Sequence, residues 1–333
     1  MSSSVPSPPP SVAIPAPGRS SPSRWTLHGL NNGLIFWATC RGVAILPKRV
    51  SYAIGDVGSW LAWRLMRRTR EALADNLAAI FPDEAPLARE RRARLTLRAY
   101  ARDVIDFLCA LEVPPEEAGA LFTHEPADVE LFRTLLARGR GIVLVSGHYG
   151  NWELGSVAAR RVFDLPLAIV AMAEPSDRVN TLRRRIRDRL GADTIEVRKS
   201  LDTALQIRKR LADNSTVALL MDRHLDRDRI EVRFLGRPAW FLRTPVLMAF
   251  LSGAPLVPCF IERLADGRFS VRAGDPVFVA TDVPRDQAIQ HAAQQFASQL
   301  EVRVRRCPEY WYQFYRYWDA QRDASGPARV DEG

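Results

Sequence analysis

Residues 141–155 read GIVLVSGHYGNWELG, a stretch that joins an apolar run to a group of polar side chains. The run from Gly141 to Val145 is short, rich in β-branched residues and bounded by glycine, which is typical of a buried strand. A turn follows it, and Trp152 begins a helical pattern that continues to about Val162. In open α/β sheets, ligands and catalytic residues lie at the carboxyl ends of the strands, and His148 lies at such an end.

His148 and Glu153 are five positions apart, which in one continuous helix would turn them about 140° away from each other. They meet only if His148 ends the strand and Glu153 lies in the first turn of the next helix. Gly150 and Asn151 suit the turn between them, with Asn151 as the helix cap. An imidazole oriented by a carboxylate is an effective general base, so the pair predicts proton abstraction from a hydroxyl. The alternative is a capping histidine followed by an acid at a helix start.

The rest of the chain alternates strand-like and helical segments. Strands are predicted over 167–172, 194–197, 216–222, 255–262 and 269–274, helices over 178–190, 200–212, 244–253 and 285–306, and a loop over 223–243. Residues 67 to about 111 have a helical pattern throughout. Strands that alternate with helices indicate an α/β fold, with a single mixed sheet flanked by helices.

The N-terminal region divides into two parts. Residues 1–24 are rich in Ser and Pro and are predicted to be a disordered tail. Residues 25–66 are apolar but interrupted by charges, so that no run reaches the ~20 residues of a spanning helix. Tryptophans and arginines flank these runs, which predicts membrane-interface helices; the alternative is two core helices. Residues 67–320 are predicted to form the main domain, and 321–333 a flexible tail.

Composition narrows the class of partner. The net charge is +9 and 44 of the 47 basic residues are arginine, which favours anionic partners. The arginines are spread along amphipathic helices without interleaved stacking aromatics, so an arginine-rich nucleic-acid-binding protein is the weaker alternative. The four cysteines have neither metal-type nor disulfide-type spacing, which indicates a reducing compartment and no metal site.

The stretch SGHYGNWELG (146–155) resembles the HxxxxD/E signature of the lysophospholipid acyltransferase superfamily, and its Gly-Asn-Trp-Glu context resembles the bacterial lipid A late acyltransferases. Four further stretches are similar to that branch in the same order: 72–83, 186–199, 234–260 and 307–318. The resemblance therefore covers about residues 28–318. It implies transfer of a fatty acyl group from an acyl carrier protein or coenzyme A thioester to a lipid hydroxyl, without a cofactor.

The resemblance also implies roles for individual residues. His148 is the expected base and Glu153 its partner, so that residues 67–320 are an acyltransferase domain. Substrate-binding candidates are the motif's own residues, a basic helix, the end of a strand and a Phe-Leu-Gly-Arg-Pro stretch: Asn151, Trp152, Arg185, Arg187, Arg189, Asp222, Arg223 and Arg237. Arginine suits phosphate recognition because its guanidinium binds two oxygens at once.

The chain departs from the late acyltransferase pattern at two places. Asp222-Arg223-His224 stands where that branch has Asp-Gln-Asp, and Glu174-Pro175 where it has Arg-Pro. Both fall where the acceptor is expected, so the acceptor is a lipid A precursor, a related glycolipid, or another polar lipid such as phosphatidylinositol mannoside. The expected location is the cytoplasmic face of the inner membrane, with the membrane surface as a partner. A scaffold with this fold and no activity is a further alternative.

Overall fold

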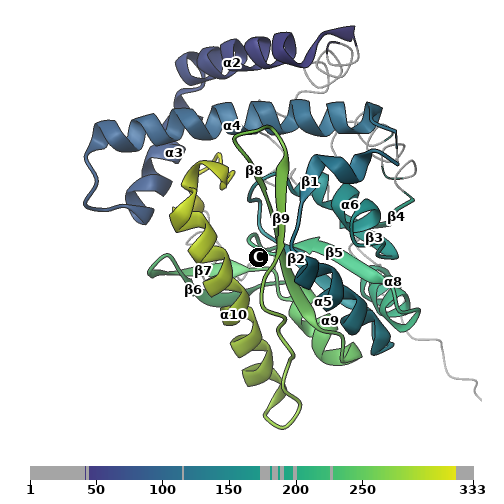
Figure 1. Ribbon diagram of the computed structural model, residues 1–333. Helices are drawn as coiled ribbons and strands as arrows, with labels where there is room; N and C mark the ends of the chain where they lie inside the picture. The colour runs from purple at the N-terminus through teal and green to yellow at the C-terminus, as the bar shows by residue number, and fades with distance from the viewer. Residues whose placement is uncertain are drawn as a thin grey trace, which may run out of the picture.

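The computed structural model describes residues 42, 45–114, 116–172, 181, 187, 191–197, 201–225 and 228–319. The predicted tails at 1–24 and 321–333, most of the N-terminal half of segment 25–66 and nearly all of the predicted helix 178–190 lie outside the described residues. Within them, the chain is an α/β fold built on one mixed sheet flanked by helices, as predicted (Figure 1).

The sheet has seven strands in the order β1-β9-β8-β2-β5-β3-β4. Their bounds are β1 Phe122–Thr123, β2 Ile142–Ser146, β3 Leu167–Ala171, β4 Asp193–Glu196, β5 Thr216–Leu220, β8 Leu256–Arg263 and β9 Phe269–Ala273. All neighbouring pairs are parallel except β8 and β9, which form an antiparallel hairpin. The central strand β2 pairs with β5 on one side and β8 on the other.

Alternate side chains of β2 enter two different cores, because neighbouring residues of a strand face opposite sides of the sheet. Val143 and Val145 belong to the larger core, which also holds side chains of α8, α9 and α10. Ile142 and Leu144 belong to the smaller one, with α5 and α6. The helix bounds are α5 Pro126–Ala137, α6 Trp152–Arg161, α8 Leu201–Ala212, α9 Thr244–Ser252 and α10 Arg285–Arg306. Covered on both faces, the sheet can be apolar throughout.

A second, two-stranded sheet occupies part of the segment predicted as a loop. Its strands are β6, Ile230–Phe234, and β7, Arg237–Phe241, and they pair antiparallel. Leu235 and Gly236 form the turn with positive φ angles of 52° and 79°, as a tight hairpin turn requires. The sequence does carry the signal, because Ile230, Val232 and Phe234 alternate with charged residues and point inward.

Three helices precede the sheet: α2 Lys48–Leu65, α3 Arg67–Ile80 and α4 Pro86–Glu112. Figure 1 shows α2 and α4 side by side across one end of the molecule. Gly55 brings them close, since a Cβ there would lie 2.7 Å from Ile105 Cδ1. Asp56 of α2 accepts paired hydrogen bonds from Arg98 and Arg102 of α4. The N-terminal region is thus fastened to the domain by packing and by ion pairs.

Candidate active site

His148 and Asp222 are brought together by the pairing of β2 with β5. Ser146 and Leu220, the last residues of these strands, are register partners in a parallel ladder. His148 and Asp222 each follow two residues later, so they leave the sheet side by side. The imidazole Nδ1 lies 2.6 Å from Asp222 Oδ1, and the His148 backbone N–H donates to Oδ2 at 2.9 Å. One carboxylate therefore fixes both the backbone and the ring of His148.

The turn that carries His148 is pinned on both sides. Gly150 has φ 60°, and a Cβ there would lie 1.9 Å from the Ile261 carbonyl oxygen, so only glycine fits. The Gly150 N–H donates to Tyr310 O, and the Tyr312 N–H donates to His148 O at 2.8 Å. The turn is thus held between the segment after α10 and the backbone of β8.

Asp222 is fully buried and accepts hydrogen bonds from several donors. Besides His148, Trp311 Nε1 donates to Oδ2 at 3.1 Å and Gln313 Nε2 donates to the same oxygen at 2.7 Å. Burial alone would raise the pKa of Asp222, but the facing imidazole, the charge of Arg223 and the donated bonds hold it below its usual value. Asp222 is therefore an anion that accepts from Nδ1, which leaves the lone pair on Nε2.

The side chain of His148 is 18% exposed. Burial and then the positive charge of Arg223 lower its pKa, against the opposing effects of Asp222 and Glu153. A lowered pKa keeps the imidazole neutral near pH 7, the form that can accept a proton. Trp152 packs edge-on against the ring at 5.3 Å between centroids.

A cavity of about 390 Å³ lies beside His148, between the sheet and α6. Its walls are mainly apolar residues of β2, β3, β5 and β8: Leu144, Leu167, Ile169, Ala218, Leu220, Cys259 and Ile261. Gly155 and Ser156 of α6 close the opposite side. Polar and aromatic groups lie at the end nearest His148: Glu153, Arg223, Tyr312 and Tyr315. Arg187 also lines the cavity. An apolar channel that ends at a base suits a long hydrocarbon chain with a reactive carbonyl.

The carboxylate bonded to Nδ1 is not the one expected from the HxxxxE spacing. Glu153 lies in the first turn of α6 and lines the cavity, and its charge acts on His148, but Asp222 holds the Nδ1 position. Asp222 reaches the ring because β5 lies next to β2 and delivers a carboxylate at ring distance, and the orienting role of Glu153 stays a prediction. The predicted strand-to-helix junction itself is present, since β2 ends at Ser146 and α6 begins at Trp152.

Asn151 has a structural role in the turn, and its predicted substrate contact stays a prediction. It is buried, its Oδ1 accepts from Leu154 N–H as the cap of α6, and its Nδ2 donates to Asp103 O at 2.9 Å. It is absent from the described cavity wall, whereas Trp152 is part of it.

The predicted substrate-binding arginines lie in different places. Arg187 and Arg223 line the cavity. Arg185 and Arg189 lie outside the described residues. Arg237 is exposed at the start of β7 and stacks on Trp318 with its guanidinium 5.4 Å from the ring centroid, apart from the described cavity wall. Its predicted substrate contact stays a prediction.

Several site residues were missed by sequence reasoning. Trp311 and Gln313 bind Asp222, and Tyr312, Phe314 and Tyr315 line the cavity. The aromatic run 307–318 marks this segment as unusual, but nothing local places it beside β2 and β5. His224, within the segment predicted as a loop, is buried and also lines the cavity. Among the described residues, no cluster of three His, Cys, Asp or Glu side chains could hold a metal ion.

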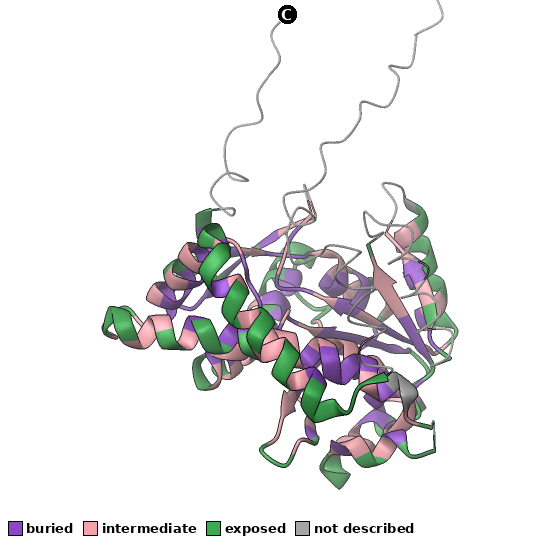
Figure 2. Ribbon diagram, turned by 90° about the horizontal axis from the view of Figure 1, so that it is seen from above, coloured by how far each residue is buried: buried purple, intermediate pink, exposed green. Residues whose placement is uncertain are grey.

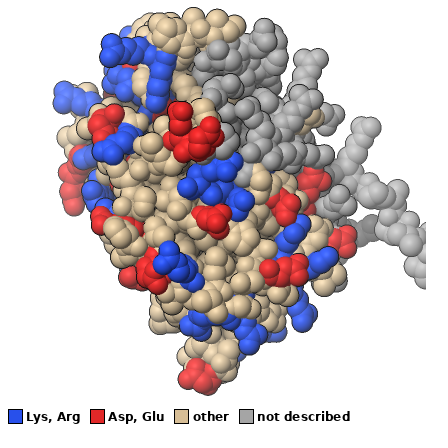
Figure 3. Space-filling model, turned by 45° about the vertical axis from the view of Figure 1, so that its right-hand side comes forward, with Lys and Arg blue, Asp and Glu red and all other residues tan. Residues whose placement is uncertain are grey.

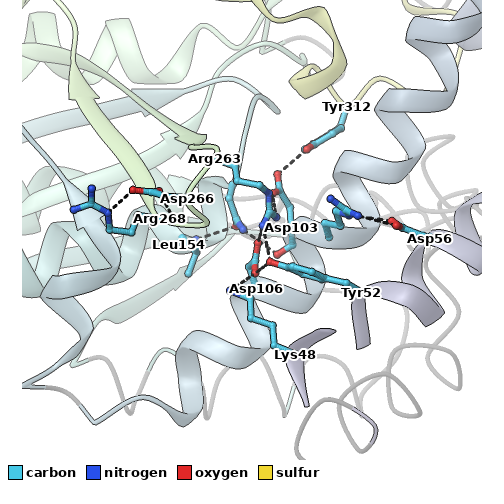
Figure 4. Close-up of polar contacts among 12 residues, drawn as sticks. Lys48, Tyr52, Asp56, Asp103, Asp106, Leu154, Arg263, Asp266, Arg268 and Tyr312 are labelled. Atoms are coloured by element: carbon cyan, nitrogen blue, oxygen red, sulfur yellow. Dashed lines mark hydrogen bonds and ion pairs between the residues drawn. The ribbon is translucent and has the colours of Figure 1, made fainter. Parts of the chain in front are cut away.

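A second buried polar cluster joins α2, α4 and β8 (Figure 4). Arg263 lies between two aspartates of α4, donating to Asp103 Oδ1 at 2.8 Å and pairing with Asp106. Tyr52 and Lys48 of α2 also bind Asp106. Tyr312 OH donates to Asp103 Oδ2 at 2.6 Å. The cluster therefore links the N-terminal helix to a residue of the cavity wall.

The outer face of α2 is apolar, the reverse of an ordinary surface helix. Eight large side chains are exposed there or just before it: Ile45, Leu46, Val50, Ile54, Val57, Trp60, Leu61 and Leu65. Six of them recur every three or four residues and so form one stripe. Figure 2 looks down on this end of the molecule, where exposed positions cover the outward side of the helices. Among the described helices, none has the length and apolar character needed to cross a membrane.

Comparison with known proteins points to one enzyme class. A family model described as bacterial lipid A biosynthesis acyltransferase matches residues 21–320. A phosphatidylinositol mannoside acyltransferase of Mycolicibacterium smegmatis is 24% identical over 305 residues, which cover 83% of this chain and 95% of that protein. Another, of Mycobacterium tuberculosis strain H37Rv, is 27% identical over 201 residues, covering 59% of this chain and 60% of that protein.

Proposed function

The chain belongs to the bacterial lipid A biosynthesis acyltransferase family and is an acyltransferase, and we propose that it moves a fatty acyl chain from a thioester to a hydroxyl of a glycolipid. The thioester is that of an acyl carrier protein or coenzyme A. The observation that carries this proposal is the bond between His148 Nδ1 and Asp222, at the polar end of an apolar cavity.

In the proposed reaction, His148 Nε2 takes the proton of the acceptor hydroxyl as its oxygen attacks the thioester carbonyl carbon. Asp222 holds the required tautomer and stabilises the imidazolium that forms. When the carbon–sulfur bond breaks, the departing thiolate takes the proton back from the imidazolium. The products are an ester and a free thiol, so that no atom of the enzyme enters a covalent intermediate.

The acyl chain is proposed to lie in the cavity between the sheet and α6. Ala218 and Gly155 are small residues on facing walls, and Leu144, Ile169 and Ile261 provide apolar surface. The thiol of Cys259, also in this wall, has its pKa raised to about 12 by burial. It is therefore a protonated, unreactive part of the lining and not a competing nucleophile.

Two acceptors are compatible with this chemistry. Family membership favours a lipid A precursor or a related glycolipid. The two mycobacterial relatives, each named for phosphatidylinositol mannoside, favour an acceptor of that kind as the second candidate. Arg187, in the cavity wall, suits a phosphate in either acceptor.

The apolar stripe on α2 is proposed to rest on the membrane surface, at the cytoplasmic face of the inner membrane. An amphipathic helix of this kind lies in the interface with its apolar side chains below the headgroups. Arg64 stacks on Trp60 of the same helix with its guanidinium 5.1 Å from the ring centroid, which combines the two residue types that favour this depth. On the face seen in Figure 3, basic and acidic side chains are interspersed, unlike the single-sign surface that nucleic-acid binding favours.

The reaction is tested by incubating the purified full chain with a long-chain acyl-CoA or acyl carrier protein thioester. A lipid A precursor and phosphatidylinositol mannoside are supplied as acceptors, and products are identified by mass spectrometry. We expect one acceptor to gain a single acyl chain, and His148→Ala to lose at least about 10³-fold in kcat. Equal product from His148→Ala and the wild type would overturn the mechanism.

Membrane contact is tested by sedimentation with anionic phospholipid vesicles. The double substitution Ile54→Glu and Val57→Glu on α2 is expected to reduce vesicle binding at least tenfold. Leu205→Glu, at an exposed leucine of α8, is the matched control and should bind like the wild type. Unchanged binding of the α2 variant would exclude this surface as the contact.

A further inference from the structure

The guanidinium of Arg223 is held at the polar end of the cavity by three contacts. Its Nε donates to Gln313 Oε1 at 3.0 Å, and its Nη2 donates to Tyr312 O at 2.9 Å. The group also lies over the Tyr315 ring, 5.3 Å from the centroid. These contacts fix the plane of the guanidinium, and the side chain is only partly exposed.

Arg223 and His148 both form hydrogen bonds with the backbone of Tyr312. Tyr312 donates its N–H to His148 O and accepts from Arg223 Nη2 through its own carbonyl. Gln313 similarly binds Asp222 through Nε2 and Arg223 through Oε1. The base, its carboxylate and the guanidinium are therefore held as one unit by two adjacent residues of the C-terminal segment.

The position of Arg223 is therefore electrostatically matched to the reaction. Attack of the hydroxyl moves the carbonyl electron pair of the thioester onto oxygen, where negative charge builds up beside His148. A fixed cation close to that oxygen, in a largely apolar cavity, stabilises the transition state more than the ground state.

On these grounds we infer that Arg223 is a catalytic residue, which stabilises the oxyanion formed on the thioester carbonyl during acyl transfer. The inference rests on the proposed function and adds to it the group that receives the developing charge. The alternative role for an arginine here is to bind a phosphate of donor or acceptor, which would strengthen substrate binding without selecting the transition state.

The test compares Arg223→Gln and Arg223→Lys in steady-state acyl transfer with a long-chain acyl-CoA and the acceptor identified above. We expect Arg223→Gln to lower kcat about 10²- to 10³-fold, with KM for each substrate within about threefold of the wild type. Arg223→Lys keeps the charge but loses the planar set of guanidinium donors, and its kcat should be about tenfold higher than that of Arg223→Gln. Arg138→Gln, which removes an exposed arginine stacked on Phe278, is the control for loss of one charge and should keep wild-type kcat.

A pH profile tests whether the charge of Arg223 acts on His148. The charged groups that act on His148 are Asp222, Glu153 and Arg223, and Arg187 and His224 line the same cavity. Because Arg223 lowers the pKa of His148, its loss in Arg223→Gln should move the acidic limb of kcat/KM to higher pH. Arg223→Lys should leave that limb in place. A structural defect would lower the rate without moving the limb.

The outcomes are distinguishable from failure of the proposed function. If His148→Ala keeps wild-type activity, the proposed mechanism itself fails. If His148→Ala is inactive but Arg223→Gln keeps at least a third of wild-type kcat, only the role of Arg223 is overturned. A loss confined to KM would also overturn it, in favour of phosphate binding. If Arg223→Gln does not fold, Arg223→Lys decides by the same criteria.

Discussion

Asp222 and Asp103 are both buried and both bind the C-terminal segment, yet their pKa values shift in opposite directions. That segment is extended, so that Trp311 and Gln313 point to Asp222 and Tyr312 points to Asp103. Asp222 accepts four donated bonds and faces a histidine and an arginine, and its pKa is lowered. Asp103 is the more weakly compensated of the two.

For Asp103, burial raises the pKa to about 6, and the neighbouring Asp106 adds to the shift against the opposing effects of Arg263 and Tyr312. The difference shows that burial alone does not set the charge of a carboxylate. The charge also depends on the number of hydrogen-bond donors and on the presence of a second acid nearby. A permanently ionised Asp222 suits catalysis, whereas Asp103 contributes to fastening α2 and the cavity wall.

The largest expected effect is that of Asp222→Asn. An amide presents a donor to Nδ1 in place of an acceptor, so the histidine takes the wrong tautomer and loses its imidazolium partner. We expect kcat for acyl transfer to fall about 10³- to 10⁴-fold, while circular dichroism remains that of a folded protein. Asp103→Asn is the matched control, and its kcat should stay within tenfold of the wild type. Similar kcat values for the two variants would break the comparison.

Glu153→Gln should have a smaller effect than Asp222→Asn. Glu153 supports the imidazolium by its charge, whereas Asp222 also bonds the ring and the backbone of His148. We expect kcat to fall about tenfold, the change that ~1.4 kcal/mol of transition-state stabilisation represents. A greater loss for Glu153→Gln than for Asp222→Asn would restore the role that the HxxxxE spacing predicts.

These two acids show what the sequence could predict and what it could not. His148 at the end of a strand, the helix starting at Trp152 and the α/β alternation are local patterns, and all three are present in the structure. The resemblance pointed to Glu153 as partner because it lies five residues away. Asp222 lies 74 residues away and meets His148 only because β5 pairs with β2. The order of the strands depends on long-range packing, which local sequence periodicity does not determine.

The same limit explains the missed C-terminal residues. Trp311 and Gln313 reach Asp222 across about 90 positions of chain. The aromatic run was visible in the sequence, but aromatic residues at such spacing are most often core. The hairpin β6–β7 was missed for a different reason, because its charged outward side chains and Gly236 resemble a loop. Its alternating Ile230, Val232 and Phe234 were the available signal.

Asp103→Asn should alter the pH dependence of stability. The raised pKa means that the folded state keeps a proton that the unfolded chain has lost between about pH 4 and pH 6. Stability therefore falls as pH rises through this window, by about 2–3 kcal/mol for this group. The variant cannot titrate, so its free energy of unfolding relative to the wild type should rise by that amount from pH 4 to pH 7.

Urea denaturation at pH 4 and pH 7 measures this difference. Asp266→Asn is the control, since Asp266 is exposed, pairs with Arg268 and has a lowered pKa. Its contribution is present above the unfolded pKa and is lost on acidification, so its effect should be small and of opposite sign. A constant difference between Asp103→Asn and the wild type at both pH values would refute the shift assigned to Asp103.

The smallest expected effect is that of Tyr52→Phe, which removes the hydroxyl that joins α2 to Asp106 and accepts from Arg263 Nη1 at 2.7 Å. Losing these bonds should lower the free energy of unfolding by about 1–2 kcal/mol, measured by urea denaturation at pH 7. Ser59→Ala removes a hydroxyl bonded within α2 and should cost less than about 0.5 kcal/mol. Because Tyr52 bonds only the second cluster, kcat should stay near wild type; a loss like that of Asp222→Asn would mean that the two buried clusters act as one.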